Sequence, residues 1–299
     1  MKQKILVILL TFFVILFYIF PMNQTSTKDE VVIKNTIQNK VKASALFDDV
    51  DTIIDNTLND GTRYSVFLAY PQKSSETYIY NSQKWRSASM IKMFILAAAM
   101  DKVSKGTLDL DEITILNADD KVGGAGILVG YPSGYEISIR QILKLMITES
   151  DNTATNIIID RIGMQNINNY IKINGYDDTV LQRKMMDMSA INEGIENYSS
   201  VTDLGKIFTK IYHHRCVNYE CDEIMLDFLK AQTDRDCFPA ALPDKIIAHK
   251  TGALNGLYDD GGIIYNDDSD TILVIMTEDF VSEYSAIECM KSFARSVVF

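Results

Sequence analysis

Hydrophobic residues follow a strand-like pattern in some segments of this chain and a helical period of three to four residues in others. The order of these segments predicts a protein that mixes helices and strands. Short runs rich in β-branched and aromatic residues predict two groups of strands near the two ends of the chain. Runs with an apolar residue at every third or fourth position predict helices around and between these groups. The expected strands are Arg63–Tyr70, Glu76–Tyr80, Ile246–Lys250, Gly261–Tyr265 and Thr271–Thr277. The expected helices are Ala43–Leu58, Met90–Lys102, one capped by Ser138, Thr153–Ile162, Val201–His213, Asp222–Ala231 and Ser282–Val297.

The order of these elements predicts an α+β fold. The simplest packing joins all five strands in one antiparallel sheet, with the first and the last helix on one face. The folded domain then covers residues 45–299, with an α/β lobe made of residues 45–86 and 245–299. Residues 87–244 form an inserted all-helical lobe, and a cleft between the lobes is the natural place for a functional site.

The N-terminal segment differs from the rest of the chain. Lys2 and Lys4 precede an apolar run from Ile5 to Phe20, which is typical of an export signal. We interpret residues 1–22 as a signal peptide or an uncleaved membrane anchor and residues 23–44 as a polar linker. The remainder is then expected to be exported to the extracellular face, either secreted or attached to the membrane.

Charge and composition exclude several classes of protein. Apolar residues make up 47% of the chain, which is enough for a sizeable core and excludes a disordered chain. Asp and Glu number 40 against 29 Lys and Arg, so the net charge is -11. An acidic chain has no general attraction for phosphate backbones, and we therefore expect no nucleic-acid partner.

Three short motifs fall where the cleft is expected. In the first, Ser89-Met90-Ile91-Lys92, a serine and a lysine share one helix face, and a lysine with a lowered pKa can take a proton from a serine hydroxyl. The second, Ser150-Asp151-Asn152, lies at a turn between two helices, where Asp151 is expected to cap the second helix. The third, Lys250-Thr251-Gly252, lies at the end of an expected strand, where the glycine allows close approach of a ligand.

Each motif is common alone, but together and in this order they are the signature of class A β-lactamases and penicillin-binding proteins. Around the motifs, Trp85–Lys92 and Met146–Asn156 also resemble that family of penicillin-recognising serine hydrolases. The resemblance implies a β-lactamase-like/DD-peptidase fold. It also implies a β-lactam or a D-alanyl-D-alanine-type peptide as the small-molecule substrate.

The resemblance further implies a role for each motif residue. Ser89 would be the nucleophile that is acylated, and Lys92 would accept its proton. Ser150 would pass a proton to the leaving nitrogen, assisted by Lys250. The substrate-binding residues implied are Asn152 for the side-chain amide, Thr251 and Lys250 for the carboxylate, and Gly252 with Ala253, whose backbone N–H would share the oxyanion hole with that of Ser89.

The sequence departs from the family at the omega loop, which normally supplies a glutamate that activates the deacylating water. Arg183 matches the start of this loop, which aligns Met185 with the glutamate and Ser189 with an asparagine that assists it. A thioether cannot act as a general base. Three nearby carboxylates, Asp187, Glu193 and Glu196, are candidate substitutes, but for each we favour the interpretation of a solvated loop carboxylate.

A second departure follows the third motif. Residues 254–261 contain acidic Asp259 and Asp260 but no arginine, whereas many class A enzymes use an arginine there to bind the substrate carboxylate. Recognition of a carboxylate would therefore depend on Lys250, Thr251 and an arginine elsewhere in the chain.

These departures leave three functions open. The first is a β-lactamase with a substitute base, and the second is a D-alanyl-D-alanine peptidase that is acylated by β-lactams but releases them slowly. The third is a membrane-anchored protein that binds β-lactams or wall peptides without turnover. The complete set of Ser89, Lys92, Ser150 and Lys250 favours an enzyme over a purely structural role.

The remaining candidates for chemistry are cysteines and histidines. Cys216, Cys221, Cys237 and Cys289 permit two disulfides or free buried thiols, and the sequence leaves both open. The spacing of these cysteines with His213 and His214 matches no standard zinc pattern, so we expect no metal ion and no cofactor. We interpret His249 as a structural histidine, and we expect the protein to be a monomer.

Overall fold

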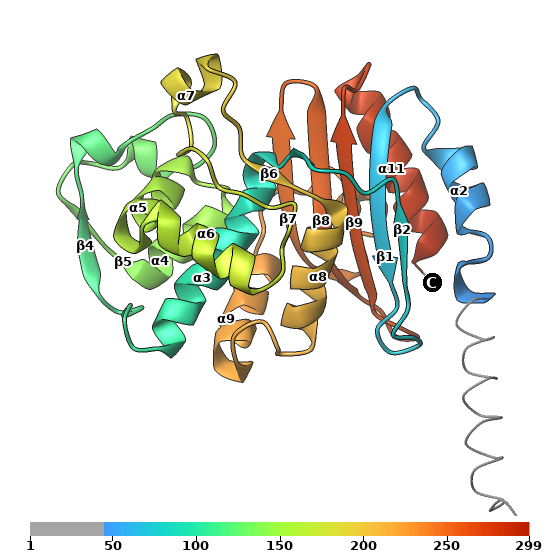
Figure 1. Ribbon diagram of the computed structural model, residues 1–299, viewed down its shortest axis with the longest axis horizontal. Coiled ribbons are helices and arrows are strands. Elements are labelled where there is room, and N and C mark those ends of the chain that lie inside the picture. The colour runs from blue at the N-terminus through green and yellow to red at the C-terminus, as the bar shows by residue number, and fades with distance from the viewer. Residues whose placement is uncertain (1–44, 299) are drawn as a thin grey trace, which may run out of the picture. The chain divides into compact units, whose positions relative to one another are not determined.

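The computed structural model describes residues 45–298 of the chain (Figure 1). Within this part, no helix is both long and apolar enough to cross a membrane. The expected signal or anchor at residues 1–22 and the linker at 23–44 lie outside the described residues.

Five strands form one antiparallel sheet in the order β2-β1-β9-β8-β7. Its strands come from both ends of the described chain, as the hydrophobic pattern predicts: β1 (Arg63–Ala69), β2 (Thr77–Tyr80), β7 (Ile246–Leu254), β8 (Leu257–Tyr265) and β9 (Thr271–Glu278). The central strand β9 is buried along its whole length. At the edge, β7 pairs with β8 in a register that sets Lys250 opposite Gly261. The expected α+β fold is therefore confirmed.

Successive side chains of a strand point to opposite faces, and this alternation divides the core in two. Val66 and Leu68 of β1 pack with helices α2 (Val50–Thr57) and α11 (Glu283–Val297). Phe67 and Ala69 face the other side, where α8 (Val201–Tyr212) and the helical block cover the sheet. The first and last helices thus share one face of the sheet, as predicted (Figure 1).

The helical block is built around the strongly buried helix α3 (Lys92–Ser104). Its other helices are α4 (Ile139–Thr148), α5 (Asn152–Ile162), α6 (Met164–Ile173), α7 (Met188–Asn192) and α9 (Tyr219–Lys230), with short 3₁₀ turns at Ala118–Asp120 and Leu128–Gly130. The 3₁₀ turn Ala45–Phe47 precedes α2, and α10 (Phe238–Ala241) packs against α11 on the other face of the sheet. The block is not all-helical as expected. It also holds a two-stranded ribbon of β4 (Ile113–Leu116) and β5 (Tyr135–Ser138), and β6 (Tyr198–Ser199) pairs with β3 (Trp85–Arg86). The strands β3 and β6, at two residues each, are too short to produce a readable alternation in the sequence.

Helix starts follow the polar residues that the sequence marks as caps. Ser138 accepts a hydrogen bond from the Gln141 N–H at the start of α4, and Ser282 caps α11 in the same way. Several boundaries differ from the prediction, and two of them bear on the site: β8 begins at Leu257, and β7 continues to Leu254, so the Lys250-Thr251-Gly252 motif lies inside the strand and not at its end. Pairing of Leu254 with Leu257 extends both strands as a hairpin past the motif.

Candidate active site

Ser89 lies on a short 3₁₀ helix, η2 (Ala88–Ile91), that leads directly into α3. Residues three apart eclipse one another in a 3₁₀ helix, so Ser89 stands over Lys92 at the first turn of α3. Ala88 has a positive φ of 42°, a backbone conformation that non-glycine residues adopt at a cost and that is concentrated at functional sites. The backbone thus turns sharply just before the candidate nucleophile.

Strand β7 approaches this turn closely, and Gly252 is the reason it can. A Cβ on Gly252 would lie 3.1 Å from Met90 Cγ and 3.2 Å from Ala88 Cβ, tighter than ordinary contact. A residue with a Cβ at this position would require Met90 or Ala88 to shift by a few tenths of an ångström. Gly252 therefore brings Ala253, which follows it, to the cavity that Ser89 also lines.

Lys92 is completely buried, and its Nζ contacts both motif serines. It lies 3.0 Å from Ser89 Oγ, 3.1 Å from Ser150 Oγ and 2.9 Å from Asn152 Oδ1. Burial lowers the pKa of Lys92 well below its ordinary value, and the positive charge of Lys250 lowers it further. A lysine in this state can hold or release a proton between the two hydroxyl groups.

The Ser150-Asp151-Asn152 turn is fixed by the aspartate, as predicted. Asp151 caps α5 by accepting from the Ala154 N–H, and its other oxygen accepts from the N–H groups of Ile127 and Leu128. This anchoring holds Ser150 at a positive φ of 51°. Asn152 is turned toward Lys92, and its Nδ2 donates to the Gly123 carbonyl.

Lys250 is the second buried lysine of the site. Its Nζ donates to Ser150 Oγ at 3.1 Å and to the Thr251 carbonyl at 2.7 Å. Burial lowers the pKa of Lys250 to about 8, although the carboxylates of Asp234 and Asp260 oppose this effect. The two lysines and two serines therefore form one connected chain, Ser89–Lys92–Ser150–Lys250.

His249, next to Lys250 in β7, points away from the two lysines and two serines of the site and into the core. It is buried, and its Nδ1 lies 2.8 Å from Asp260 Oδ1 on the neighbouring strand. The second oxygen of Asp260 accepts from the Phe238 N–H at the start of α10. His249 thus belongs to a buried network behind the site.

A cavity of about 180 Å³ opens in front of Ser89. Its lining is mostly apolar and comes from the nucleophile turn, the loop after β4, the segment 183–197 and β7. The lining residues are Ala88, Ser89, Gly124, Ala125, Asn152, Arg183, Met185, Met186, Ile191, Glu196, Asn197, Ala253 and Leu254. Of the motif residues, Ser89 and Asn152 line this cavity, together with Ala253, the residue after the third motif.

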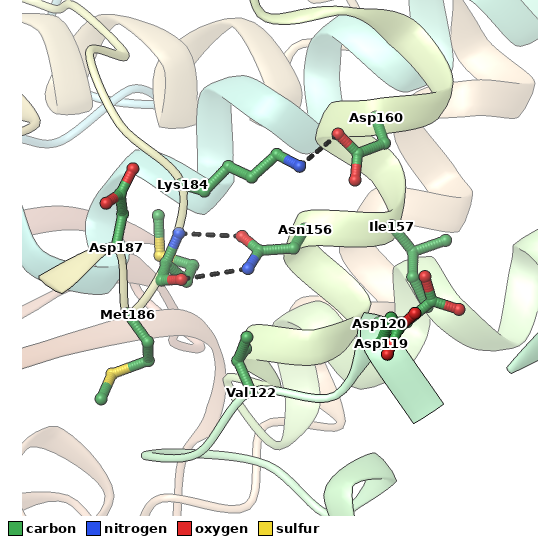
Figure 2. Close-up of a pocket in the computed structure, with 10 residues that line it drawn as sticks. Asp119, Asp120, Val122, Asn156, Ile157, Asp160, Lys184, Met186 and Asp187 are labelled. Carbon is green, nitrogen blue, oxygen red and sulfur yellow. Dashed lines mark hydrogen bonds and ion pairs between the residues drawn. The ribbon is translucent and has the colours of Figure 1, made fainter. Parts of the chain in front are cut away.

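Two sets of contacts hold the segment 183–197 against this cavity. Asn156 of α5 accepts from the Met185 N–H at 2.8 Å and donates to the Met185 carbonyl at 3.0 Å (Figure 2). At the ends of the segment, the Arg183 guanidinium donates to Glu196 Oε2 at 2.6 Å and 3.2 Å. Asn156 thus fixes the Met185 backbone, and the Arg183–Glu196 pair ties the two ends of the segment together.

Met185 and Met186 line both this cavity and a second, acidic hollow of about 260 Å³. Figure 2 shows Asp187, Asp119 and Asp120 around this second hollow, where Lys184 pairs with Asp160. Its lining does not include Ser89 or any other residue of the three motifs. The larger hollow is therefore separate from the motif residues.

The three carboxylates considered as substitute bases occupy different places. Asp187 caps α7 through the Ala190 N–H and lines the acidic hollow. Glu193 is exposed and is not among the residues that line the cavity at Ser89. Glu196 lines that cavity, but one of its oxygens accepts both hydrogen bonds from Arg183. Ser189, aligned with the assisting asparagine, is exposed on α7 and does not line the cavity.

Two contacts at the site went unnoticed in the sequence. Asn156 lies in the segment Met146–Asn156 that resembles the family. Nothing in the surrounding sequence shows that it hydrogen-bonds to both the N–H and the carbonyl of Met185. Asp234 lies in the loop before α10, and its carboxylate accepts from Thr251 Oγ1 at 2.8 Å. The Tyr258 hydroxyl donates to the same carboxylate at 3.3 Å. The sequence around Asp234, two positions after Gln232 in a loop, gives no sign that this carboxylate contacts Thr251.

All four cysteines are free thiols, so the disulfide alternative is wrong. Cys216 lies 3.6 Å from the Tyr170 hydroxyl, and Cys221 donates to the Met100 carbonyl. Burial raises the pKa of Cys216 to about 12. Such thiols are inert packing groups.

Comparisons with known proteins agree with this geometry. A sequence model described as a β-lactamase enzyme family matches residues 45–298. β-Lactamase VEB-1 from Pseudomonas aeruginosa is 23% identical over 223 residues, which cover 71% of this chain and 74% of that protein.

Solved structures of similar fold cover nearly all of the described residues. A β-lactamase from Sphaerobacter thermophilus has a TM-score of 0.78 and 26% identity, and the match covers 84% of this chain and 95% of that one. The structure of PBP-A has a TM-score of 0.76 and 25% identity over 83% of this chain and 93% of that one.

Proposed function

This chain belongs to the β-lactamase enzyme family and is a serine hydrolase of the class A type. On that premise we propose that it attacks a β-lactam or a peptide-like amide with Ser89, forms an acyl-enzyme and releases the acyl group slowly. The observation that carries this proposal is the buried Nζ of Lys92, in hydrogen-bond contact with Ser89 Oγ and Ser150 Oγ at once.

Acylation follows from this chain of contacts. Neutral Lys92 takes the proton of Ser89 Oγ, and the oxygen attacks the carbonyl carbon of the substrate. As the bond between that carbon and nitrogen breaks, Ser150 Oγ gives its proton to the nitrogen and regains one from the Lys92 ammonium. The positive charge of Lys250, 3.1 Å from Ser150 Oγ, stabilises the oxygen while its proton is in transfer.

The remaining motif residues would hold the substrate. The backbone N–H groups of Ser89 and Ala253 would bind the developing oxyanion, and removal of one such donor typically costs about 10²–10³ in rate. Asn152 would bind the side-chain amide of the substrate. The apolar lining from Met185, Met186 and Leu254 favours an apolar group at the acyl end.

Deacylation is the step for which the site is poorly equipped. The activation of a water molecule needs a base within hydrogen-bond reach, and a positioned base contributes about 10²–10⁴ in rate. The side chain at the expected position is Met185, and the carboxylate in the same cavity, Glu196, is paired with Arg183. Slow release of the acyl group follows from these two facts.

A D-alanyl-D-alanine peptidase is the second candidate, and Met185 is the observation that favours it over an efficient β-lactamase. Such an enzyme would be acylated by β-lactams and release them slowly, whereas it would turn over wall peptides. A protein that binds these ligands without any turnover is the third alternative. Lys2, Lys4 and the apolar run after them support export with secretion or membrane attachment in each case, and we expect a monomer.

The experiment mixes the purified protein with benzylpenicillin and follows its intact mass over time. We expect an adduct that persists and is absent from Ser89→Ala. Ser87→Ala is the matched control, because Ser87 is buried two residues earlier and its Oγ has no hydrogen-bond partner among the described residues. An adduct on Ser89→Ala would exclude Ser89 as the nucleophile.

Two further assays separate the alternatives. Steady-state hydrolysis of a chromogenic cephalosporin is expected only of a β-lactamase. Release of D-alanine from a peptide ending in D-alanyl-D-alanine is expected of the peptidase and not of a binding protein without turnover.

A further inference from the structure

The subsite next to Lys250 contains an acid where a substrate carboxylate would bind. Under the proposed function, Thr251 and Lys250 hold the group that follows the bond to be broken. Asp234 already occupies the hydroxyl group of Thr251, since its Oδ2 accepts the Thr251 hydroxyl proton at 2.8 Å. A hydroxyl group has one proton, so Thr251 cannot donate to Asp234 and to a ligand at the same time.

Other contacts hold the Asp234 carboxylate in this place. The Tyr258 hydroxyl, on a buried side chain, donates to it at 3.3 Å, and the Asp236 N–H donates to its Oδ1 at 3.1 Å. The Asp234 N–H donates in turn to Gln232 Oε1, on a buried side chain. The carboxylate is therefore anchored from several directions beside the motif strand.

The electrostatics of the subsite follow from this placement. Lys250 supplies one positive charge, and its Nζ already donates to Ser150 Oγ and to the Thr251 carbonyl. Asp234 supplies a negative charge that opposes it, since the Asp234 carboxylate is hydrogen-bonded to Thr251, the residue after Lys250. A second carboxylate that enters at Thr251 would meet this like charge, which is unfavourable.

Resting on the proposed function, we infer that Asp234 makes this subsite select substrates that end in a hydrogen-bond donor, such as a primary carboxamide, over substrates that end in a free carboxylate. A carboxamide N–H₂ group donates to the carboxylate of Asp234 and accepts through its oxygen from Lys250. A carboxylate has no proton to donate and adds a second negative charge.

Arg235, adjacent to Asp234, is the competing candidate. Its side chain is exposed and has no hydrogen bond or ion pair with the described residues. If it folded over the subsite, it would neutralise Asp234 and attract a carboxylate. The two arrangements predict opposite preferences, so one pair of ligands separates them.

The test compares benzylpenicillin with its primary carboxamide, which has the same ring and side chain. Second-order rate constants for acylation are measured by intact mass for the unmodified protein, Asp234→Asn and Asp236→Asn. We expect the ratio of carboxylate to carboxamide rates to rise at least about tenfold in Asp234→Asn, on the scale of one hydrogen bond to a charged group. Asp236→Asn removes the same charge from an exposed side chain in the same loop and should change the ratio by less than about twofold.

Three results would overturn the inference. The ratio could stay unchanged in Asp234→Asn, or it could rise equally in Asp236→Asn, which would reveal only an effect of net charge. The unmodified protein could also prefer the carboxylate and lose that preference in Arg235→Gln.

Binding without acylation keeps the inference separate from the proposed function. Calorimetric titration of Ser89→Ala with both ligands needs no chemical step, and the carboxamide should bind more tightly until Asp234→Asn is added to that variant. Preferential binding without acylation of the unmodified protein would refute the proposed function alone. Equal binding of the two ligands, or binding of neither, would overturn the inference.

Discussion

Substitution of Met185 by glutamate tests the explanation for slow deacylation most directly. The Met185 side chain is 7% exposed and lines the cavity at Ser89, while its backbone is held by two hydrogen bonds from Asn156. These bonds involve only backbone atoms of residue 185, so they are compatible with a glutamate. The carboxylate of that glutamate would then enter the same cavity as the acyl group.

We expect the deacylation rate to increase about 100-fold. A positioned base contributes about 10²–10⁴. The lower end applies because burial raises the pKa of the new carboxyl, and each unit above the assay pH costs about tenfold in the ionised fraction. Ser189 is also exposed on α7 and offers no second hold on the water.

The assay follows the loss of the benzylpenicillin adduct after excess ligand is removed. Met188→Glu is the matched control, since Met188 is an exposed methionine of α7 that does not line the cavity. This control introduces the same charge nearby and should leave the deacylation rate unchanged. The melting temperature of each variant is measured as well, because a charge at a buried position costs stability.

Rapid multiple turnover of benzylpenicillin by the unmodified protein would refute the reasoning, because another residue would then supply the base. Glu196, the carboxylate that lines the same cavity, would be tested next by Glu196→Gln. Adduct loss that is equally slow in the unmodified protein and in a folded, acylated Met185→Glu protein would contradict the placement of residue 185 beside the water.

Three further predictions follow. Acylation should slow above about pH 8, because burial lowers the pKa of Lys250 to about 8 and the neutral amine no longer assists Ser150; a stopped-flow pH profile measures this, and an unchanged rate at pH 10 would contradict it. Asp259→Asn should stabilise the protein more at pH 8 than at pH 5. Burial raises the pKa of Asp259 well above its ordinary value, so its contribution to stability is present at low pH and lost as the pH rises through the raised pKa; melting temperatures at both values check this, and a difference that does not depend on pH would refute it. Deletion of residues 1–27 should leave active protein in the cytoplasm, and cell fractionation that finds the truncated protein still at the surface would refute the export signal.

The periodic pattern of the sequence was sufficient for the five-stranded sheet and for the first and last helices that cover one of its faces. The strands Arg63–Ala69 and Thr271–Glu278 lie in a sheet buried on both faces, so their apolar runs follow from burial that any correct fold must provide. Ser138 and Ser282 mark helix starts because capping is a contact between residues three apart. Local rules of this kind can be read without knowing the path of the chain.

The contacts within the first two motifs also join residues that are close in sequence. Ser89 and Lys92 are three residues apart on one turn, and Asp151 caps the helix that begins with Asn152. The order of the three motifs along the chain was enough to predict that they meet. The short strands β4 and β5 were not predicted.

Only the tertiary structure decided how the departures from the family are arranged. The sequence identifies Met185 as a departure from the family. It contains no sign that Asn156 hydrogen-bonds to the Met185 backbone or that the Arg183 guanidinium pairs with the Glu196 carboxylate. Asp234 reaches Thr251 because β7 continues past the motif and the loop before α10 folds back against it. Such contacts join residues that are neighbours in space but have no periodic or motif relation in sequence. The physical reason is that a hydrogen bond between distant segments depends on where the whole backbone places two atoms, which residue types alone do not specify.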